Sequence, residues 1–356
     1  MRLLFITVRS DFGGGPRHVN QLIELLPSTC SVYMAYPSRG EPYGKSWENN
    51  KRIKDTCFIP FRRFSLKALF ELRRFVIRNN IHIVHSHGNG AGIYSRLLKI
   101  IYPQIKVIHT FHGISDNYSS NIKGLMSHFI GRILSPFADK YIAVSYGEKQ
   151  LAIKRKFSKV TNIQVIYNGI EDIGGEAKLE MHYPIRIVTL SRFDYQKNME
   201  SLYRIALHCR DLPIKFIWIG DGKDKQYLEL LSKQNNANIE FVGFSNVPMK
   251  YLKKSDWYMS TSRFEGLPYA LIEAASVGLP IIASNVKGNN EVTIDGYNGF
   301  LFRTEEQAIE ILERLVNKSV DYEKLSTNSI ELFKKHFSDV KMINELQKLY
   351  KQFNLD

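Results

Sequence analysis

Cysteine is scarce in this chain, and long apolar runs are missing from it. The three cysteines, Cys30, Cys57 and Cys209, are isolated and odd in number, which excludes a disulfide framework or a cysteine metal cage. We expect them to be core residues. No apolar run reaches the roughly 18 residues of a membrane-spanning helix, and the first eight residues resemble a buried strand more than a signal peptide. The sequence therefore predicts a cytoplasmic protein.

Two short patterns are also missing, and both bear on chemistry. The triplet Asp, any residue, Asp occurs nowhere in the 356 residues, so no such pair of carboxylates is available to hold a divalent metal. The glycine spacing of the dinucleotide fingerprint is absent as well. We therefore expect a chemistry with no obligatory metal and no cofactor.

The positive charge is divided unevenly along the chain. The net charge is +14, and residues 1–172 carry 25 Lys and Arg against 11 Asp and Glu, whereas the remaining residues balance. The segment 61–75 interleaves Phe and Leu with cations, including Arg62, Arg63, Arg73 and Arg74. Such a segment can lie on an anionic membrane surface, where each cation contributes about 1 kcal/mol.

Two other interpretations of the basic segment remain open. It is also typical of a solvated helix face above an apolar stripe that packs in a core. Nucleic acid would attract the same charge, but nothing in the chain resembles a nucleic-acid-binding module. We therefore expect no nucleic-acid partner.

Strand-like and helix-like segments alternate through both halves, which indicates parallel sheets covered on both faces. We expect an α/β protein with two doubly wound, Rossmann-like domains that face each other across a cleft. The expected strands are Leu3–Val8, Ser31–Tyr36, Ile81–His85, Val107–Thr110, Tyr141–Val144, Ile185–Leu190, Ile214–Ile219, Ile239–Val242, Trp257–Ser260 and Pro280–Ser284, with helices at 66–79 and 91–100 among those between them.

A polar, glycine-containing stretch separates the two halves. Asn168-Gly169 marks a turn, and a linker is expected near residues 172–183. Residues 338–354 carry apolar side chains at helical spacing, so they form an amphipathic helix that needs a partner. The predicted domains are residues 1–172 with 338–356, and residues 173–337.

The segment 262–275 carries two carboxylates, Glu265 and Glu273, in a setting that suits a long anionic ligand. Pro268 and the helix formers after it predict a helix that begins near Leu267. Eight helical positions span at most roughly 12 Å, too far for an acid and base pair on one bond. The helix N-terminus between the carboxylates suits a diphosphate. A sugar, a diphosphate and a ribose would follow one another in this order.

With their flanking sequence, these carboxylates resemble a known signature. Glu265 and Glu273, followed by 278–284, Glu291 and 298–301, are similar to the motif of the retaining GT-B glycosyltransferases of family 4, also called group 1. That family includes bacterial mannosyltransferases and surface-polysaccharide glycosyltransferases. The resemblance covers nearly the whole chain and implies that the last helix crosses back to the first domain. It also implies transfer of a hexose-type sugar from a nucleotide sugar, with retention at the anomeric carbon.

The resemblance also implies roles for single residues in the donor site. Glu265 would hold hexose hydroxyls, Glu273 the ribose, and Arg192 with Lys197 the diphosphate, while the segment of Phe244 would hold the base. The donor-binding set is Gly14, Gly15, Arg192, Lys197, Phe244, Glu265, Gly266, Leu267 and Glu273.

Histidines mark the expected site in the first half. Three glycines, residues 13–15, follow the first strand and allow a close approach to a ligand. His112 with Gly113 matches the family position that contacts the donor hexose, so the catalytic set is His112, Arg192, Lys197 and Glu265. His87 is a candidate acceptor contact or structural support. Zinc is the competing interpretation, which we do not adopt because no carboxylate or cysteine is spaced to complete a site.

The sequence thus predicts a glycosyltransferase on the inner face of the plasma membrane. The expected acceptor is a lipid-linked or oligosaccharide chain of a bacterial O-antigen, capsule or exopolysaccharide. Two alternatives stay open: a non-catalytic subunit that binds a nucleotide sugar or tethers partners at the membrane, and a nucleotide-sugar epimerase of the same architecture. The sugar, the base and the linkage are not specified by the sequence.

Overall fold

The structure is a computed structural model that describes residues 1–38, 42–114 and 122–353. The chain divides into two compact units. The first unit comprises Met1–Asn168 and Val340–Asp356, and the second comprises Gly169–Asp339. Each unit is described by itself.

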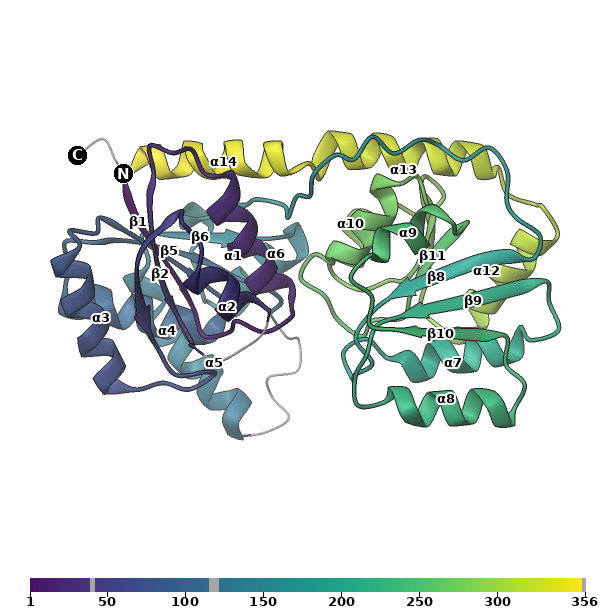
Figure 1. Cartoon of the computed structure of the whole chain (residues 1–356), viewed down its shortest axis with the longest axis horizontal. Helices are drawn as coiled ribbons and strands as arrows, with labels where there is room; N and C mark the ends of the chain where they lie inside the picture. The colour runs from purple at the N-terminus through teal and green to yellow at the C-terminus, as the bar shows by residue number, and fades with distance from the viewer. Residues whose placement is uncertain (39–41, 115–121, 354–356) are drawn as a thin grey trace. The chain divides into compact units, whose positions relative to one another are not determined.

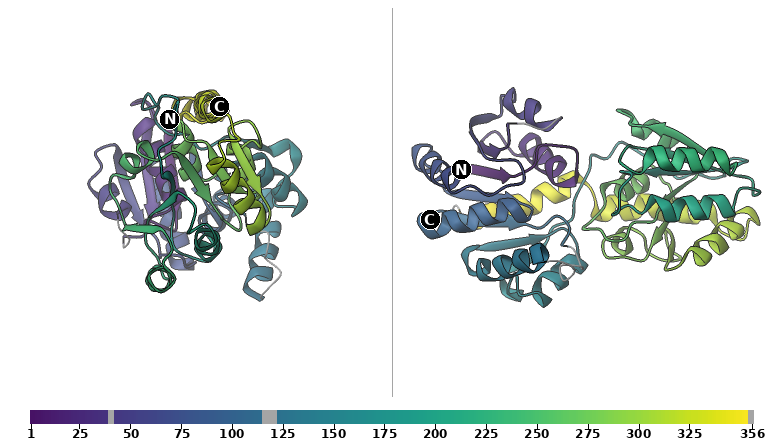
Figure 2. Two further views of the ribbon diagram at one scale, coloured as in Figure 1. Left: turned by 90° about the vertical axis from the view of Figure 1, so that its right-hand side faces the viewer. Right: turned by 90° about the horizontal axis from the view of Figure 1, so that it is seen from below.

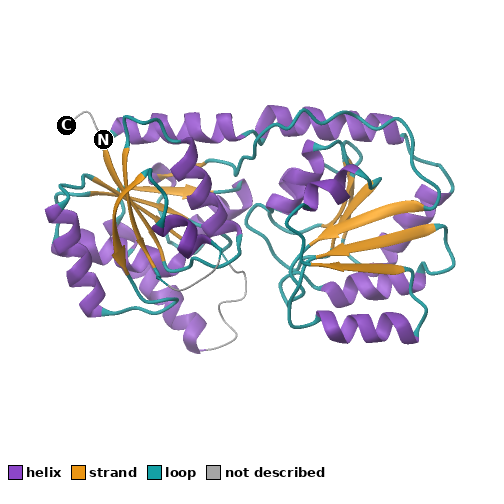
Figure 3. Cartoon of the chain, viewed as in Figure 1, coloured by secondary structure: helices purple, strands orange, loops and turns teal. Residues whose placement is uncertain are grey.

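The first unit is a parallel sheet of seven strands in the order β3-β2-β1-β4-β5-β6-β7. Helices cover both of its faces (Figure 3). Its strands are β1 Arg2–Thr7, β2 Ser31–Tyr36, β3 Ile53–Phe58, β4 Ile83–His87, β5 Lys106–Thr110, β6 Lys140–Ala143 and β7 Ile163–Val165. Its helices are α1 Gly14–Leu25, α2 Tyr43–Glu48, α3 Leu66–Arg78, α4 Asn89–Ile101, α5 Ile122–Ile133, α6 Tyr146–Lys154 and α14 Asp339–Gln352, with short 3₁₀ turns at Ser135–Phe137 and Val160–Asn162.

Alternate residues of the central strands feed two cores, one on each face of this sheet. Leu4 and Ile6 of β1 join the core that contains α3 and α4, whereas Leu3 and Phe5 join the core that contains α1 and α14. The buried residues of α14 are Met342, Ile343, Leu346, Leu349 and Tyr350. The last helix therefore finds its partner on the first unit, as predicted.

The second unit is a parallel sheet of six strands in the order β10-β9-β8-β11-β12-β13. The strands are β8 Ile185–Leu190, β9 Ile214–Ile219, β10 Ile239–Gly243, β11 Trp257–Ser260, β12 Ile281–Ser284 and β13 Gly299–Phe302. The helices are α7 Met199–His208, α8 Lys225–Gln234, α9 Pro248–Lys253, α10 Tyr269–Ser276, α11 Asn289–Val292, α12 Glu305–Val316 and α13 Tyr322–His336. Two doubly wound, Rossmann-like units are confirmed.

Several predicted boundaries move. β4 begins and ends two residues later than predicted, because it pairs with β1 from Leu3↔Ile83 to Thr7↔His87. Helix α10 begins at Tyr269 and not near Leu267, because Pro268 has an extended ψ of 121° and stands before the first helical residue. Strands β3, β7 and β13 were absent from the prediction.

The compact units divide at Asn168, four residues before the predicted boundary. At this point two distant parts of the chain run side by side. Ile170 donates its N–H to the Phe337 carbonyl and accepts from the N–H of Asp339, at 3.0 and 2.9 Å. A Cβ atom at Gly169 would lie 2.4 Å from the Ser338 carbonyl oxygen, so the contact requires glycine.

Within the described part of the chain, none of the helices combines the length and the apolarity that a membrane crossing requires.

Candidate functional site

In the second unit, the loop after β8 grips a buried carboxylate. The Lys197 Nζ lies 2.6 Å from Oε1 of Glu265, and the Gln196 amide donates to Oε2 of the same carboxylate at 3.3 Å and to the Phe264 carbonyl at 3.1 Å. Glu265 is only 6% exposed. A carboxylate this deeply buried needs paired charge and hydrogen bonds, and two consecutive residues of one loop supply them.

Arg192 is connected to the same group through Gln196. The guanidinium donates to the Gln196 side-chain oxygen at 3.0 Å and pairs with Asp194 at 3.1 Å. About half of the Arg192 side chain is exposed. The structure therefore brings Arg192, Lys197 and Glu265 together in one hydrogen-bonded chain. Gln196, which the sequence reading did not single out, links them.

Side chains and backbone hold this loop against the segment before α10. The Thr261 hydroxyl donates to the carbonyls of Lys197 and Asn198 at 3.2 and 3.0 Å. The Arg263 N–H donates to the Gln196 carbonyl at 2.8 Å, and its guanidinium lies 4.3 Å from the centroid of the Tyr195 ring. Neither loop can shift alone, so the Lys197–Glu265 geometry is preorganised.

A glycine supports this loop from behind. Gly288 has a φ of +86°, and a Cβ atom there would lie 2.4 Å from the Gly266 carbonyl oxygen. The backbone at Gly288 therefore packs directly against Gly266. Gly266 and the buried Leu267 lead from Glu265 to the start of α10. These two residues occupy the place where the sequence predicts N–H groups for a diphosphate.

Glu273 lies buried on α10 and shares a neighbour with Glu265. The Tyr258 hydroxyl donates to the Leu190 carbonyl at 3.0 Å. Burial raises the pKa of Tyr258 well above its usual value, and the negative charges of Glu273 and Glu265 raise it further. Both predicted carboxylates therefore act on one tyrosine at the base of the site. Phe244 follows β10 and is half-exposed.

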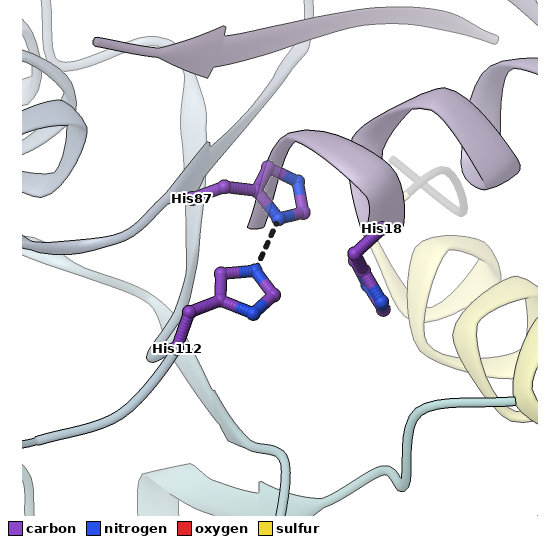
Figure 4. Close-up of side chains that lie close together, drawn as sticks. All are labelled: His18, His87 and His112. Carbon is purple, nitrogen blue, oxygen red and sulfur yellow. Dashed lines mark hydrogen bonds between the residues drawn. The ribbon is translucent and has the colours of Figure 1, made fainter. Parts of the chain in front are cut away.

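The first unit has a cluster of three histidines (Figure 4). His87 ends β4, His112 follows β5 and His18 lies on α1. The Nδ1 of His87 and the Nε2 of His112 are 3.1 Å apart, and one ring nitrogen from each of the three lies within 4.8 Å of the others. A Cβ atom at Gly15 would touch the His112 ring at 3.6 Å, while Gly14 is the first residue of α1. The glycine-rich start of α1 therefore packs on His112.

Three imidazoles at this spacing could hold a transition metal, which binds three histidines in many catalytic zinc sites. The sequence offers no cysteine or carboxylate at zinc spacing. A search for ligands at short spacing does not find His18, because it lies far from His87 and His112 along the chain. The His87–His112 distance is equally that of a hydrogen bond between two rings.

Burial keeps these histidines neutral. Desolvation lowers the pKa of His18 to about 4, although a hydrogen bond with Asn168 opposes the shift. Desolvation also holds the pKa values of His85, His87 and His109 well below their usual range. Neutral imidazoles offer one donor and one acceptor each, so they can orient polar groups without adding charge.

A further buried histidine, His85, connects α14 to the histidine cluster. His85 bonds through Nδ1 to the Tyr350 hydroxyl and through Nε2 to the Thr110 hydroxyl, both at 2.7 Å. The rings of His85 and His87 have centroids 4.1 Å apart. The last helix of the chain therefore contributes a polar contact beneath the histidine cluster.

Glu148 positions the loop of His112, and the sequence reading missed it. Its Oε1 accepts the N–H groups of Gly113 and Ile114 at 2.6 and 3.0 Å, and its Oε2 accepts that of Val144 at 2.9 Å. The side chain is fully buried. A signal was available, because Ser145 and Glu148 have capping-box spacing, and the Ser145 hydroxyl does accept the Glu148 N–H. The Glu148 carboxylate therefore joins the loop of His112 to the neighbouring loop at Val144.

The basic segment 61–75 is only partly built into the first unit, since Phe61, Phe64, Leu66 and Phe70 are 39, 43, 64 and 54% exposed. The apolar stripe of α3 is packed in the core (Ala68, Leu69, Leu72, Phe75 and Val76). Arg62 pairs with Asp11 at 3.2 Å, and Arg73 donates to the Ile101 carbonyl at 3.2 Å. Arg63 and Arg74 lie at the surface or near it. For α3 itself, the arrangement is that of a solvated face over a core stripe.

Two family models match the chain, one in each half. The model of Glycosyltransferase Family 4 matches residues 12–172, and the model of Glycosyl transferases group 1 matches residues 177–332.

Curated relatives align over most of the chain. The O-antigen biosynthesis glycosyltransferase WbnH of Escherichia coli is 26% identical over 86% of this chain and 87% of its own length. The UDP-Gal:alpha-D-GlcNAc-diphosphoundecaprenol alpha-1,3-galactosyltransferase of Escherichia coli is 25% identical over 80% and 79%. The capsular polysaccharide biosynthesis glycosyltransferase CapH of Staphylococcus aureus is 27% identical over 82% and 83%.

Solved structures share the fold over its full length. Anabaena HepE, crystallised with UDP, superposes with a TM-score of 0.83 at 16% identity and covers 99% of this chain and all of its own. The lipopolysaccharide outer core galactosyltransferase WaaB superposes with a TM-score of 0.77 at 19% identity and the same coverage. At these identities the likeness concerns the fold alone.

The bonds of Glu148 predict a local effect of the substitution Glu148→Gln. The amide must turn an N–H group toward at least one backbone N–H, which leaves a buried donor unsatisfied at a cost of about 1–3 kcal/mol. We expect faster amide hydrogen exchange at Val144 when the amide oxygen keeps the Gly113 and Ile114 N–H groups, and at Gly113 and Ile114 when the amide is turned the other way. Ser145→Ala is the matched control, because it removes the cap of α6 and leaves the Glu148 carboxylate in place. Equal exchange in both variants would contradict a positioning role.

The buried histidines predict that acid destabilises the first unit more than the second. Their folded pKa values lie below the unfolded value near 6.5, so only the unfolded chain takes up protons as the pH falls from about 6.5 toward 4. The free energy of unfolding then falls by up to about 1.4 kcal/mol per pH unit for each histidine. The second unit has only exposed or partly exposed histidines, at 182, 208 and 336.

Tryptophan fluorescence can follow each unit separately. Trp47 alone reports on the first unit in a Trp218→Phe, Trp257→Phe variant, and the Trp47→Phe variant reports on the second. Denaturation at pH 7.5 and at pH 5 should show a larger loss at Trp47. Equal losses in the two variants would argue against neutral buried histidines.

Proposed function

The chain belongs to the glycosyltransferases of family 4 and group 1, and from that premise we propose the reaction that its site supports. It transfers a hexose-type sugar from a nucleotide sugar to a lipid-linked saccharide, with retention of the anomeric configuration. The product is part of a bacterial surface polysaccharide. The names of relatives that build O-antigen and capsule support this pathway.

The group of Arg192, Gln196, Lys197 and Glu265 carries the proposal. It combines an acceptor for sugar hydroxyls with two cations for a diphosphate, in the order that a nucleotide sugar presents them. Arg192 offers planar paired donors and Lys197 a point charge. In the free protein Lys197 neutralises Glu265, and the donor's diphosphate would take a share of that charge on binding.

The same group supports a mechanism without a metal. As the bond to the sugar breaks, negative charge develops on the leaving diphosphate, where Arg192, Lys197 and the N–H groups at the start of α10 stabilise it. Glu265, held by Lys197 and Gln196, accepts hydrogen bonds from hydroxyl groups of the hexose and does not act as a nucleophile. The acceptor hydroxyl attacks on the face that the diphosphate leaves and gives its proton to the departing diphosphate oxygen, so the bond from the anomeric carbon to the diphosphate is replaced by the glycosidic bond with retained configuration. His112 contacts the donor hexose.

The acceptor and the location follow from the relatives and the charge. One relative is named for a diphosphoundecaprenol-linked substrate, which supports a lipid diphosphate acceptor here. The cationic first half suits a position on the inner face of the plasma membrane, on anionic lipid. Incubation with membranes and a panel of labelled nucleotide sugars would identify the sugar and the base.

The two alternatives give different products. A non-catalytic subunit would bind a nucleotide sugar and neither transfer nor hydrolyse it. An epimerase would convert the donor without any acceptor. Chromatography of the donor after incubation with the protein alone separates these outcomes from slow hydrolysis by a transferase.

The site predicts that Glu265→Gln abolishes transfer and leaves nucleotide affinity nearly intact, because the sugar is the only part of the donor that the carboxylate would contact. Lys197→Ala and Arg192→Ala should each slow transfer by about a hundredfold or more, the effect of losing one preorganised charge contact. Lys197→Ala should also destabilise the fold by about 3–5 kcal/mol, since it leaves Glu265 buried and unpaired.

The double variant Lys197→Ala, Glu265→Gln separates stability from function. It removes both charges, so stability should return while transfer stays lost. Lys233→Ala, at an exposed site of the same unit, is the control for handling and expression. Full turnover in Glu265→Gln would refute this placement of the donor sugar.

A metal-free mechanism predicts that chelators leave the transfer rate unchanged. Rates measured after dialysis against a chelator, and after addition of Mn²⁺, Mg²⁺ or Zn²⁺, test this. Loss of activity with recovery in Zn²⁺ alone would instead make His18, His87 and His112 a metal site. Recovery in Mn²⁺ or Mg²⁺ would contradict the role given to Arg192 and Lys197.

A further inference from the structure

We propose that α5 and the cationic cavity beside it bind the surface of an anionic membrane. In this contact the apolar side chains of α5 enter the acyl region and the cations hold lipid phosphates. The proposal extends the membrane location of the proposed function, on which it rests, and assigns the contact to a surface other than the basic segment 61–75.

Helix α5 turns its apolar side outward. Leu125, Met126, Phe129 and Ile133 are 55, 59, 63 and 52% exposed. At 100° per residue these positions fall within one stripe about 100° wide. Such a stripe normally faces a core, and an exposed one marks a surface that binds a partner or a membrane. Figure 2 shows α5 extending from the body of the first unit.

The opposite side of α5 packs against the first unit, and this packing fixes the direction in which the apolar stripe faces. A Cβ atom at Gly131 would lie 3.1 Å from the ring of Phe157, which is buried. Buried Arg96 donates to the Gly131 carbonyl at 3.2 Å. The rings of His128 and Phe157 have centroids 5.1 Å apart. These contacts leave the apolar stripe facing away from the unit.

A cavity of about 470 Å³ lies along one flank of the stripe. Its described lining holds four cations and a histidine, with one apolar residue and no carboxylate: His128, Arg132, Leu151, Lys154, Arg155 and Lys156. The nearby charges of Arg155 and Arg132, after desolvation, lower the pKa of His128. Basic residues are favoured at a helix C-terminus, and here Lys154 is the last residue of α6 and Arg155 its C-cap. Four converging on one cavity indicate an anionic ligand.

The two features together select a lipid surface as the occupant. Helices that lie in the membrane interface bury their apolar face about 5–10 Å deep and keep cations at the level of the phosphates. Arg132 flanks the stripe on the side of the cavity, a position that would place its guanidinium at the level of the lipid phosphates. A second copy of the chain would bring four like charges against four. A nucleic acid would leave the apolar stripe in water.

Tryptophan reporters can test insertion. The natural residues Trp47, Trp218 and Trp257 are fully buried, so a new tryptophan on the surface is easily distinguished. Phe129→Trp reports on α5, and Phe70→Trp, at a 54% exposed position on α3, is the matched control. With vesicles of phosphatidylglycerol and phosphatidylcholine that carry brominated acyl chains, we expect quenching in Phe129→Trp and none in Phe70→Trp.

Other outcomes overturn the proposal. Quenching in Phe70→Trp alone would move the contact to α3. Binding without quenching in either variant would mean a purely electrostatic attachment. A dimer in sedimentation velocity that Phe129→Gln dissociates, with no vesicle binding, would identify a second copy as the occupant.

The cations predict a second result. The triple variant Lys154→Gln, Arg155→Gln, Lys156→Gln should bind anionic vesicles about a hundredfold more weakly, since each cation accounts for about fivefold. Lys233→Gln, Lys250→Gln, Lys253→Gln removes the same charge from exposed sites of the second unit and should bind like the wild type. Equal weakening in the two variants would refute a specific cavity.

Slow donor hydrolysis without vesicles tests the proposed function independently. If the wild type neither transfers nor hydrolyses any nucleotide sugar of the panel, the proposed function fails and the lipid contact stands. If hydrolysis is normal and Phe129→Trp does not insert, the lipid contact alone fails.

Discussion

Buried carboxylates must be compensated, and this requirement organises both candidate sites. Glu265 is compensated by a lysine and an amide from consecutive positions of one loop, and that loop is itself bonded to the segment that carries Glu265. Removing a partner would expose the full cost of a buried charge, so the arrangement is rigid. The rigidity serves the proposed chemistry, because charge stabilisation is effective only where the charges are already in place.

The first unit meets the same requirement differently. Glu148 is compensated by three backbone N–H groups and not by a cation, which fixes two adjoining loops at the ends of parallel strands. Around it the histidines remain neutral because burial removes their charge. One unit therefore concentrates charge that suits a diphosphate, while the other offers neutral donors and acceptors that suit hydroxyl groups.

Much of the fold could be predicted from the sequence, since strands buried on both faces are continuous apolar runs. Five strands of the second unit lie where their runs predict them, β8, β9 and β11 at the predicted residues and β10 and β12 within one residue. The edge strand β3 has polar residues at Lys54, Asp55 and Thr56 and was missed, because an edge strand is only half-buried. The roles of Gln196 and Glu148 depend on contacts between distant loops, which no local pattern encodes.

Two amphipathic helices of the first unit, α3 and α5, show the same limit more sharply. Residues of α3 and α5 both form apolar stripes, and periodicity alone gives no sign of which stripe meets the core. In α3 the stripe is buried, and two cations of the helix are bonded to the protein: Arg73 to the Ile101 carbonyl and Arg78 to Asp55. In α5 the stripe is exposed, because Gly131 and Arg96 hold its other side against the unit. The net charge of +14 in residues 1–172 thus does not locate a membrane contact. Such a contact requires positive charge and exposed apolar surface in the same place. Only tertiary packing determines where the two coincide.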